Sequence, residues 1–204
     1  MNDRFNYELE QQIDGSLPKG HIYELGKPGQ ILRKAGVPDL PIELNAATLA
    51  KKSNPNYKNS HPFDLSEVKD LPQAIQDPIM IFDSKTRADS KVILTELKSN
   101  GVNFVVAMEM SRKKGSIEVN SIRSIYPKDN IAHWIEDGLL KYENKEKASA
   151  SMNERRSNSA EVTHEAEAST NKYTKFSEEA AEKSEKNTHF QRKLSEPRYP
   201  RLKD

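Results

Sequence analysis

The chain has 204 residues and carries 32 Lys and Arg against 31 Asp and Glu, so its formal charge of +1 is not that of a strongly basic protein. It has no cysteine, which excludes disulfides, thiolate metal sites and a cysteine nucleophile and favours a reducing compartment. No apolar run approaches the roughly 18 to 20 residues that a membrane span needs, so we expect no membrane association.

Composition divides the chain into three parts. Residues 1–19 are polar and predict a flexible N-terminal arm. Residues 20–144 have the length and patterning of one folded domain. Residues 145–204 hold 13 Lys and Arg and 11 Asp and Glu with few large apolar side chains, too few to offset the entropy lost on ordering. This last part is therefore predicted to be a disordered, charged tail.

Short helices are predicted in the first half of the domain. Residues 27–36, KPGQILRKAG, have an apolar helical face and a glycine, Gly36, that ends it. Residues 41–44, PIEL, predict a short strand. Asn45 follows directly and can cap a helix over residues 46–52.

A further helix is predicted to begin after residue 64. Asp64 and Glu67 have the spacing of a capping box, in which each side chain accepts a hydrogen bond from the other residue's backbone. Pro72 lacks a backbone N–H and is predicted to end this helix early.

The second half of the domain changes to strand-like runs rich in β-branched and apolar residues, which cover residues 78–82, 91–97, 103–110 and 116–126. Asn100-Gly101 predicts a tight hairpin between the second and third runs, and the RKKG segment predicts another before the fourth. Residues 130–144 show helical spacing of apolar side chains and predict a closing helix. The expected fold is α+β: N-terminal helices packed on a four-stranded antiparallel meander, with a C-terminal helix.

The loop before Asp64 holds one candidate group, His61. Histidine exchanges protons near neutral pH, and the loop is preceded by Lys51 and Lys52, which are suited to binding phosphate. A polar loop that holds a histidine and several lysines is also common without any site, so this alternative stays open.

The last strand, VNSIRSIYP, offers the other candidate groups. Alternation places Asn120, Ser124 and Tyr126 on one face and Arg123 on the other. These side chains can hydrogen-bond or neutralise a phosphate, and the tyrosine can stack on a base. An edge strand with a solvated face has the same pattern. Glu109, in the preceding strand, is a candidate base, as is Glu96.

Several signatures are absent from the sequence. There is no glycine-rich phosphate loop, no GxSxG elbow, no HExxH motif and no cluster of His, Asp and Glu with metal-ligand spacing. We therefore expect no metal and no cofactor, and any chemistry should be done by side chains alone.

A weak pattern runs through the domain from LGKPGQILRKAGVPDLPIEL, past His61, through DLPQAIQDP and the strands IMIFDS, VILTEL and FVVAMEM, to VNSIRSIYP and IEDGLLKYENK. In these residues the chain resembles the phage MuF C-terminal toxin-like domain of the barnase, EndoU, colicin and RelE (BECR) nuclease-like group. The resemblance implies helices on an antiparallel sheet with a cleft between them. It also implies metal-independent RNA cleavage by attack of the 2′-hydroxyl on the adjacent phosphate.

Carried over by position, the resemblance makes His61 the acid or base, with Ser124 and Tyr126 as the polar groups of the last strand. Lys51 or Lys52 would bind phosphate, as would the neighbouring strand residues Arg123 and Asn120. The clear Glu, Arg and His trio of the best-known ribonucleases of this group is not found in the sequence. We expect an RNA substrate, a monomer and a cytoplasmic site of action in the host or target cell, and an immunity protein is a candidate partner.

Three hypotheses follow. The first is an endoribonuclease, a toxin or an effector of a phage or mobile element. The second is a non-catalytic module of the same fold that binds RNA or a protein, which the net charge of −1 over residues 1–144 favours. The third is a structural or interaction protein that works through its charged tail.

Overall fold

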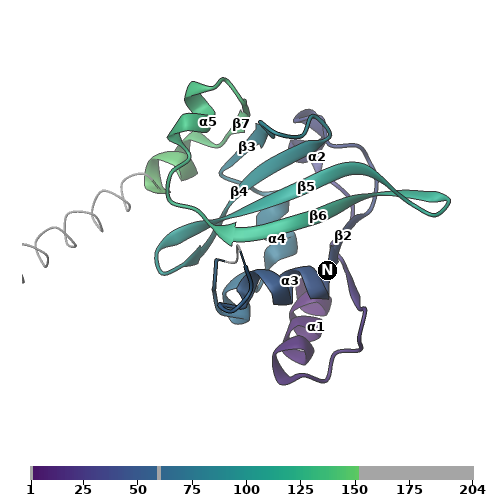
Figure 1. Ribbon diagram of the computed structural model, residues 1–204. Coiled ribbons are helices and arrows are strands. Elements are labelled where there is room, and N and C mark those ends of the chain that lie inside the picture. Colours follow the sequence, from purple (N-terminus) through teal and green to yellow (C-terminus); the bar gives the residue numbers. More distant parts are fainter. Residues whose placement is uncertain (1, 59–60, 152–204) are drawn as a thin grey trace, which may run out of the picture. The chain divides into compact units, whose positions relative to one another are not determined.

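The computed structural model describes residues 2–58 and 61–151, and the predicted disordered tail lies outside them from residue 152 onward. The described residues form one seven-stranded sheet with the order β1-β2-β6-β5-β4-β3-β7 (Figure 1). Its strands are β1 (Ile22–Glu24), β2 (Ile42–Asn45), β3 (Met80–Asp83), β4 (Ser90–Ser99), β5 (Val102–Lys114), β6 (Ile117–Pro127) and β7 (Leu140–Glu143).

The predicted four-stranded antiparallel meander is wrong, because the sheet has seven strands and is mixed. The four predicted strands are present as β3 to β6 and pair antiparallel in succession. β2 adds to β6 in parallel, β1 pairs with β2, and β7 pairs with β3. Residues 41–44 were predicted as a short strand, which is β2, but its pairing was not predicted, and β1 and β7 were not predicted as strands. All three are short and pair with strands distant in the sequence, so local patterning does not indicate their partners.

The helices among the described residues are α1 (Asn2–Asp14), α2 (Gln30–Lys34), α3 (Ala46–Ser53), the 3₁₀ helix η1 (Leu65–Val68), α4 (Leu71–Gln76) and α5 (Ala132–Glu136). Residues 145–151 are also helical. None of these helices has both the length and the apolar character that crossing a bilayer requires. Figure 1 shows α1, α3 and α4 together on one side of β5 and β6.

Local capping signals fix where α3, η1 and α4 begin. The Asn45 side chain accepts a hydrogen bond from the backbone N–H of Ala47, as predicted. The capping box of Asp64 and Glu67 also forms, although it caps the single turn of η1. Pro72 does not end that helix; it lies in the first turn of α4, where a missing N–H costs nothing.

Residues assigned by composition to a flexible arm form helix α1. Phe5 and Leu9 are spaced one helical turn apart and are 1% and 0% exposed. The Phe5 ring packs against Tyr23 of β1 with the ring centroids 5.0 Å apart. A polar helix with only two large core residues has too little apolar surface to stand out in composition, yet both residues belong to the core.

The closing helix predicted over residues 130–144 is also wrong. α5 ends at Glu136, and Gly138 adopts a left-handed conformation with φ of 72° that breaks the helical pattern. The chain then extends as β7 alongside β3. Leu140 and Tyr142 are both half-buried in this strand, but a register shift between Ile81 and Phe82 places them on opposite faces of the sheet. Leu140 packs in the cluster of Phe82, and Tyr142 packs in the cluster of Ile81.

Side chains on the two sheet faces belong to two separate apolar clusters. Ile81, Ile93, Phe104 and Val106 pack with residues of α1 to α4. Their strand neighbours Met80, Phe82, Leu94 and Val105 pack instead with Ile131 and with Ala148 of the helical segment 145–151. The segment that follows residue 144 therefore contributes to the core before the described residues end.

Asp83, at the end of β3, forms an ion pair with two lysines from neighbouring strands. Its carboxylate lies 2.5 Å from Nζ of Lys91, which is buried, and 2.9 Å from Nζ of Lys141. Burial raises the pKa of Asp83, but the two lysines outweigh this and lower it below the usual value of 3.8. A depressed folded-state pKa contributes stability above pH 3.8 that is lost as the pH falls through the folded value.

We therefore expect Asp83→Asn to weaken the protein most at neutral pH and progressively less below pH 3.8. Urea midpoints measured for both proteins across that range check this prediction. Asp89→Asn, a matched change at an exposed aspartate just before β4, is the control. A difference between wild type and Asp83→Asn that stays constant across the acid range would contradict it.

Candidate functional site

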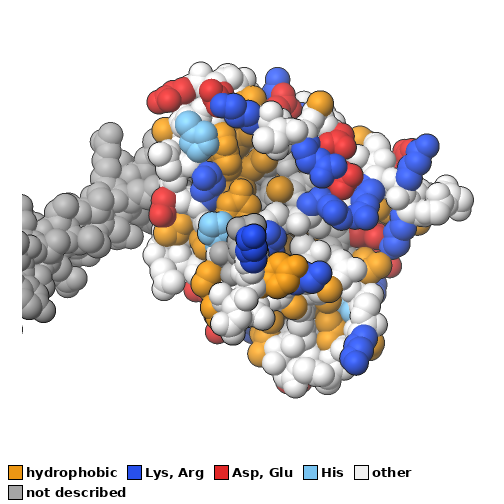
Figure 2. Space-filling view, viewed as in Figure 1, with side chains coloured by type: hydrophobic (Ala, Val, Ile, Leu, Met, Phe, Trp, Pro, Cys, Tyr) orange, Lys and Arg blue, Asp and Glu red, His pale blue; other side chains and the backbone are white. Residues whose placement is uncertain are grey.

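Part of the sheet face opposite α1 to α4 carries half-buried polar side chains on β5 and β6. In the pairing of β5 with β6, Ala107 lies opposite Ser124 and Glu109 lies opposite Ser121. Directly paired residues share a face, and Tyr126 follows Ser124 by two positions. We call Ala107, Glu109, Ser121, Ser124 and Tyr126 the open face. Figure 2 shows apolar side chains and histidine on part of this surface, with charged side chains gathered toward the β5–β6 hairpin.

A β-bulge at Arg123 changes the predicted alternation of β6. The register passes from Ala107 opposite Ser124 to Met108 opposite Ile122, which leaves Arg123 as the extra residue. Ile122 and Ile125 consequently both pack in the helical core. The bulge keeps Ser124 on the open face and leaves the Arg123 side chain exposed beside it.

The loop between α3 and η1 brings His61 to Tyr126. The two rings are stacked, with centroids 5.1 Å apart and planes inclined by 26°. Two residues later, Phe63 is buried and packs edge-on against Phe104, on the helical side of the sheet. The stack on Tyr126 places His61 on the open face, and Phe63 anchors the same loop on the helical side. The imidazole and the last-strand aromatic of the predicted site therefore lie together.

The Tyr126 hydroxyl is suited to donating a hydrogen bond. Burial raises the pKa of Tyr126 above its usual value, so the phenol keeps its proton at neutral pH. The Ser124 hydroxyl, on the same face and half-buried, is a second donor. Together they offer neutral O–H groups to a charged oxygen without acting as bases.

Two arginines hold Glu109 on the open face. Its carboxylate lies 3.4 Å from a terminal nitrogen of Arg87 and 3.2 Å from Nε of Arg123, and its side chain is 16% exposed. The predicted phosphate ligand Arg123 is thus already an ion-pair partner of the candidate base. Arg87, which precedes β4, was not predicted from the sequence, because only the pairing of β4 with β5 brings it close to Glu109. Glu96, the other candidate, pairs with Lys147 at 2.6 Å.

Asn120 is buried and lies off the open face. It is 0% exposed, and its amide donates to the carbonyl oxygens of Pro38 and Leu40 at 2.8 and 3.0 Å. Its Oδ1 accepts weakly, at 3.4 Å, from the backbone N–H of Ser111, which has a positive φ of 50°. The alternation that predicted it beside Ser124 is broken by the bulge. Asn120 instead joins the chain before β2 to β6, so its role is structural.

Lys51 and Lys52 lie in the last turn of α3, a helix that packs against β6. Nζ of Lys51 is 5.8 Å from the centroid of the Tyr57 ring. The described residues thus place both lysines near the start of the loop that carries His61. Their binding of phosphate stays a prediction.

Residues 52–150 match the profile of the family described as the phage MuF-C-terminal domain. No curated protein and no solved structure matches the chain. The matched segment is similar to that domain, contains the whole open face and His61, and continues into the helical residues 145–150. It begins after β2, so α1, β1, α2 and β2 lie outside it.

Within residues 2–58 and 61–151, no three His, Cys, Asp or Glu side chains gather as metal ligands.

Proposed function

We propose that this protein is a metal-independent endoribonuclease, a toxin or effector of a phage or mobile element, with its active site on the open face. The observation that carries the proposal is the stack of His61 on Tyr126, on the strand that also presents Ser124 and Arg123. A proton-transfer group, hydroxyl donors and a cation on one surface are what cleavage of a phosphodiester requires. The similarity of residues 52–150 to a phage domain supports the setting.

In the proposed reaction, the ribose 2′-oxygen forms a bond to the adjacent phosphorus and the bond from phosphorus to the 5′-oxygen breaks. A base accepts the 2′-hydroxyl proton, and an acid donates a proton to the leaving 5′-oxygen. The products are a 2′,3′-cyclic phosphate and a 5′-hydroxyl. We assign one of the two proton transfers to His61 and the other to Glu109, the carboxylate that Arg87 and Arg123 orient.

Charge on the phosphate grows in the transition state and needs donors already in place. The Ser124 and Tyr126 hydroxyls are neutral donors, and Arg123 supplies a positive charge from the bulge. Fixed donors at the point where charge develops contribute more than mobile water does. The bulge therefore serves the reaction by placing a cation next to two hydroxyls of one strand.

The direct test is incubation of the full chain with total RNA in EDTA, followed by analysis of the new ends. We expect fragments with 2′,3′-cyclic phosphate and 5′-hydroxyl ends. A defined oligoribonucleotide should be cut in the same way. Its counterpart with 2′-O-methyl groups lacks the 2′-hydroxyl nucleophile and should stay intact. RNA that remains full length, or 2′-O-methyl RNA that is cut at the same rate, would refute the proposal.

One observation also favours a second function, an RNA-binding module without catalysis. The His61–Tyr126 stack is an aromatic surface on which a base can stack, and base–aromatic stacking alone contributes about 1–3 kcal/mol per base. In that case the chain binds the 2′-O-methyl oligomer and leaves unmodified RNA uncut.

A further inference from the structure

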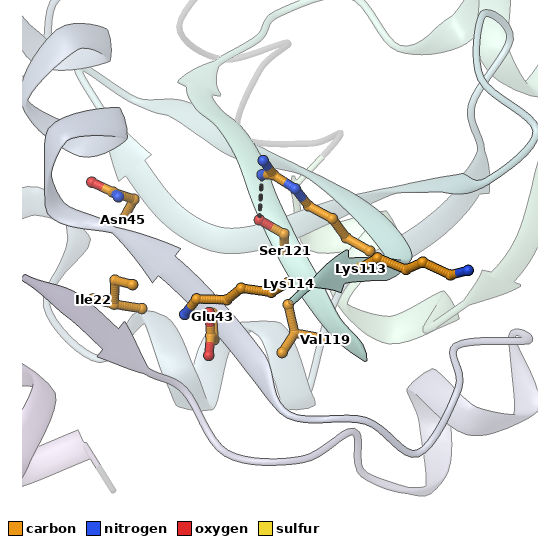
Figure 3. A pocket seen from close by; sticks show the side chains of 8 residues that line it. Ile22, Glu43, Asn45, Lys113, Lys114, Val119 and Ser121 are labelled. Carbon is orange, nitrogen blue, oxygen red and sulfur yellow. Dashed lines mark hydrogen bonds and ion pairs between the residues drawn. The ribbon is translucent and has the colours of Figure 1, made fainter. Parts of the chain in front are cut away.

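A cavity of about 160 Å³ lies at the other end of β6 from His61. One wall comes from β1 and β2 through Ile22, Glu43 and Asn45, and the other comes from the β5–β6 hairpin through Arg112, Val119 and Ser121 (Figure 3). Small-molecule pockets typically have about 300–1,000 Å³. This smaller cavity is suited to one unit of a longer chain rather than to a whole free ligand.

The cavity opens on the same side of the sheet as the open face. Glu43 is the parallel partner of Ser121, which is itself the antiparallel partner of Glu109. From Ser121 to Tyr126 is five strand residues, a span of roughly 16 Å at about 3.3 Å per residue. An extended strand of a few nucleotides can therefore reach from the His61–Tyr126 stack to the cavity along one continuous surface.

The two walls have opposite hydrogen-bonding character. The Glu43 carboxylate accepts, and it is paired at 2.8 Å with Nζ of Lys114, which is half exposed and able to move aside. On the other wall, the Arg112 guanidinium donates, and it makes one long contact of 3.5 Å to Oγ of Ser121 (Figure 3). Ile22 and Val119 provide apolar surface between them. A planar ligand with donors on one edge and acceptors on another matches these walls.

The charges around this path favour a polyanion. The cations are Arg87, Arg112, Lys114 and Arg123, against the carboxylates Glu43, Asp89 and Glu109. Four positive charges against three leave a local excess of one, although residues 1–144 as a whole carry a net charge of −1. A backbone of phosphates crossing this surface meets arginines, which bind phosphate through paired N–H groups.

We propose that this cavity is a second subsite of the RNA strand, on the far side of Glu109 from the His61–Tyr126 stack, and that it binds a guanine base. Guanine presents N–H donors to the Glu43 carboxylate and its O6 and N7 acceptors to Arg112, the commonest pairing of arginine with a base. Adenine and uracil lack this combination of two adjacent donor groups and two adjacent acceptors, so each makes fewer hydrogen bonds to the two walls. The inference rests on the proposed function for its substrate, RNA.

The test measures binding, so that it does not depend on cleavage. The full chain is titrated into fluorescein-labelled 2′-O-methyl oligouridylate and into the same oligomer with a single guanosine placed a few nucleotides from one end. We expect the guanosine oligomer to bind about tenfold more tightly or better. Glu43→Gln, which replaces an acceptor oxygen with an amide donor, should abolish this preference.

Two further variants separate recognition from structure. Glu118→Gln makes the same change on the other face of the same hairpin, opposite Lys113, and should keep the preference. Lys114→Ala removes the ion pair but leaves the Glu43 carboxylate, so it should keep the preference too. Equal binding of both oligomers by wild type, or a preference that survives Glu43→Gln, overturns the subsite. A subsite that passes while RNA stays uncut in EDTA contradicts only the nuclease proposal.

Discussion

Replacing His61 with alanine is expected to lower the rate of RNA cleavage about 10²- to 10⁴-fold, the usual contribution of one positioned acid or base. The reason is geometric: Phe63 anchors the loop, and His61 stacks on Tyr126, on the face that also carries Ser124 and Glu109. Single-turnover cleavage of a labelled oligoribonucleotide at saturating protein measures this rate.

The histidine at position 21 is the matched control. Nε2 of His21 lies 3.1 Å from a carboxylate oxygen of Glu8 in α1, away from the open face. His21→Ala should therefore cut RNA at the wild-type rate. His61→Phe separates the two roles of the ring, because phenylalanine can stack on Tyr126 but cannot transfer a proton. We expect this variant to bind the 2′-O-methyl oligomer and to fail in cleavage. Normal cleavage by His61→Phe contradicts the assigned proton transfer.

Replacing Phe5 with alanine is expected to lower the free energy of unfolding by about 3–5 kcal/mol, as for other buried aromatic residues. Phe5 is 1% exposed and packs on Tyr23, so its removal leaves a cavity between α1 and β1. This is a large fraction of the roughly 5–15 kcal/mol that stabilises a typical domain. Equilibrium unfolding in urea measures the change.

Tyr7→Ala, two positions along the same helix, is the control for this substitution. Tyr7 is 64% exposed, so its removal should change the free energy of unfolding by less than about 0.5 kcal/mol. Similar small effects for both variants would show that α1 is not part of the cooperative fold. A chain shortened to residues 20–144 would lack both α1 and Ala148, so activity is best assayed in the full chain.

Local sequence signals predicted much of the middle of the fold. The Asn45 cap, the capping box at Asp64 and the Asn100-Gly101 hairpin depend on neighbours within a few residues, and all three are present. The four strands β3 to β6 were also predictable, because they are rich in apolar and β-branched residues and follow one another along the chain. What local patterning could not provide is the set of partners for the short strands β1, β2 and β7.

The site was predicted in outline but not in detail. His61 and Tyr126 were singled out by residue type and are found stacked, although they are 65 positions apart. Asn120 was misassigned because strict alternation takes no account of the bulge at Arg123. Arg87 and the cavity between Glu43 and Arg112 depend on the folded sheet. The sequence signal that could have indicated the cavity is the run of basic residues 112–114, which ends a strand whose earlier residues are mostly apolar.

The parallel pairing of β2 with β6 bears on how the chain folds as it is synthesised. Ile42 lies beside Asn120, which is 78 positions later, so the edge of β2 that pairs with β6 has no permanent partner until residues 120–122 have left the ribosome. Contacts of such long sequence separation are formed slowly, and apolar surface stays exposed in the meantime. We therefore expect this protein to depend on chaperones during translation more than a helical bundle of equal length would.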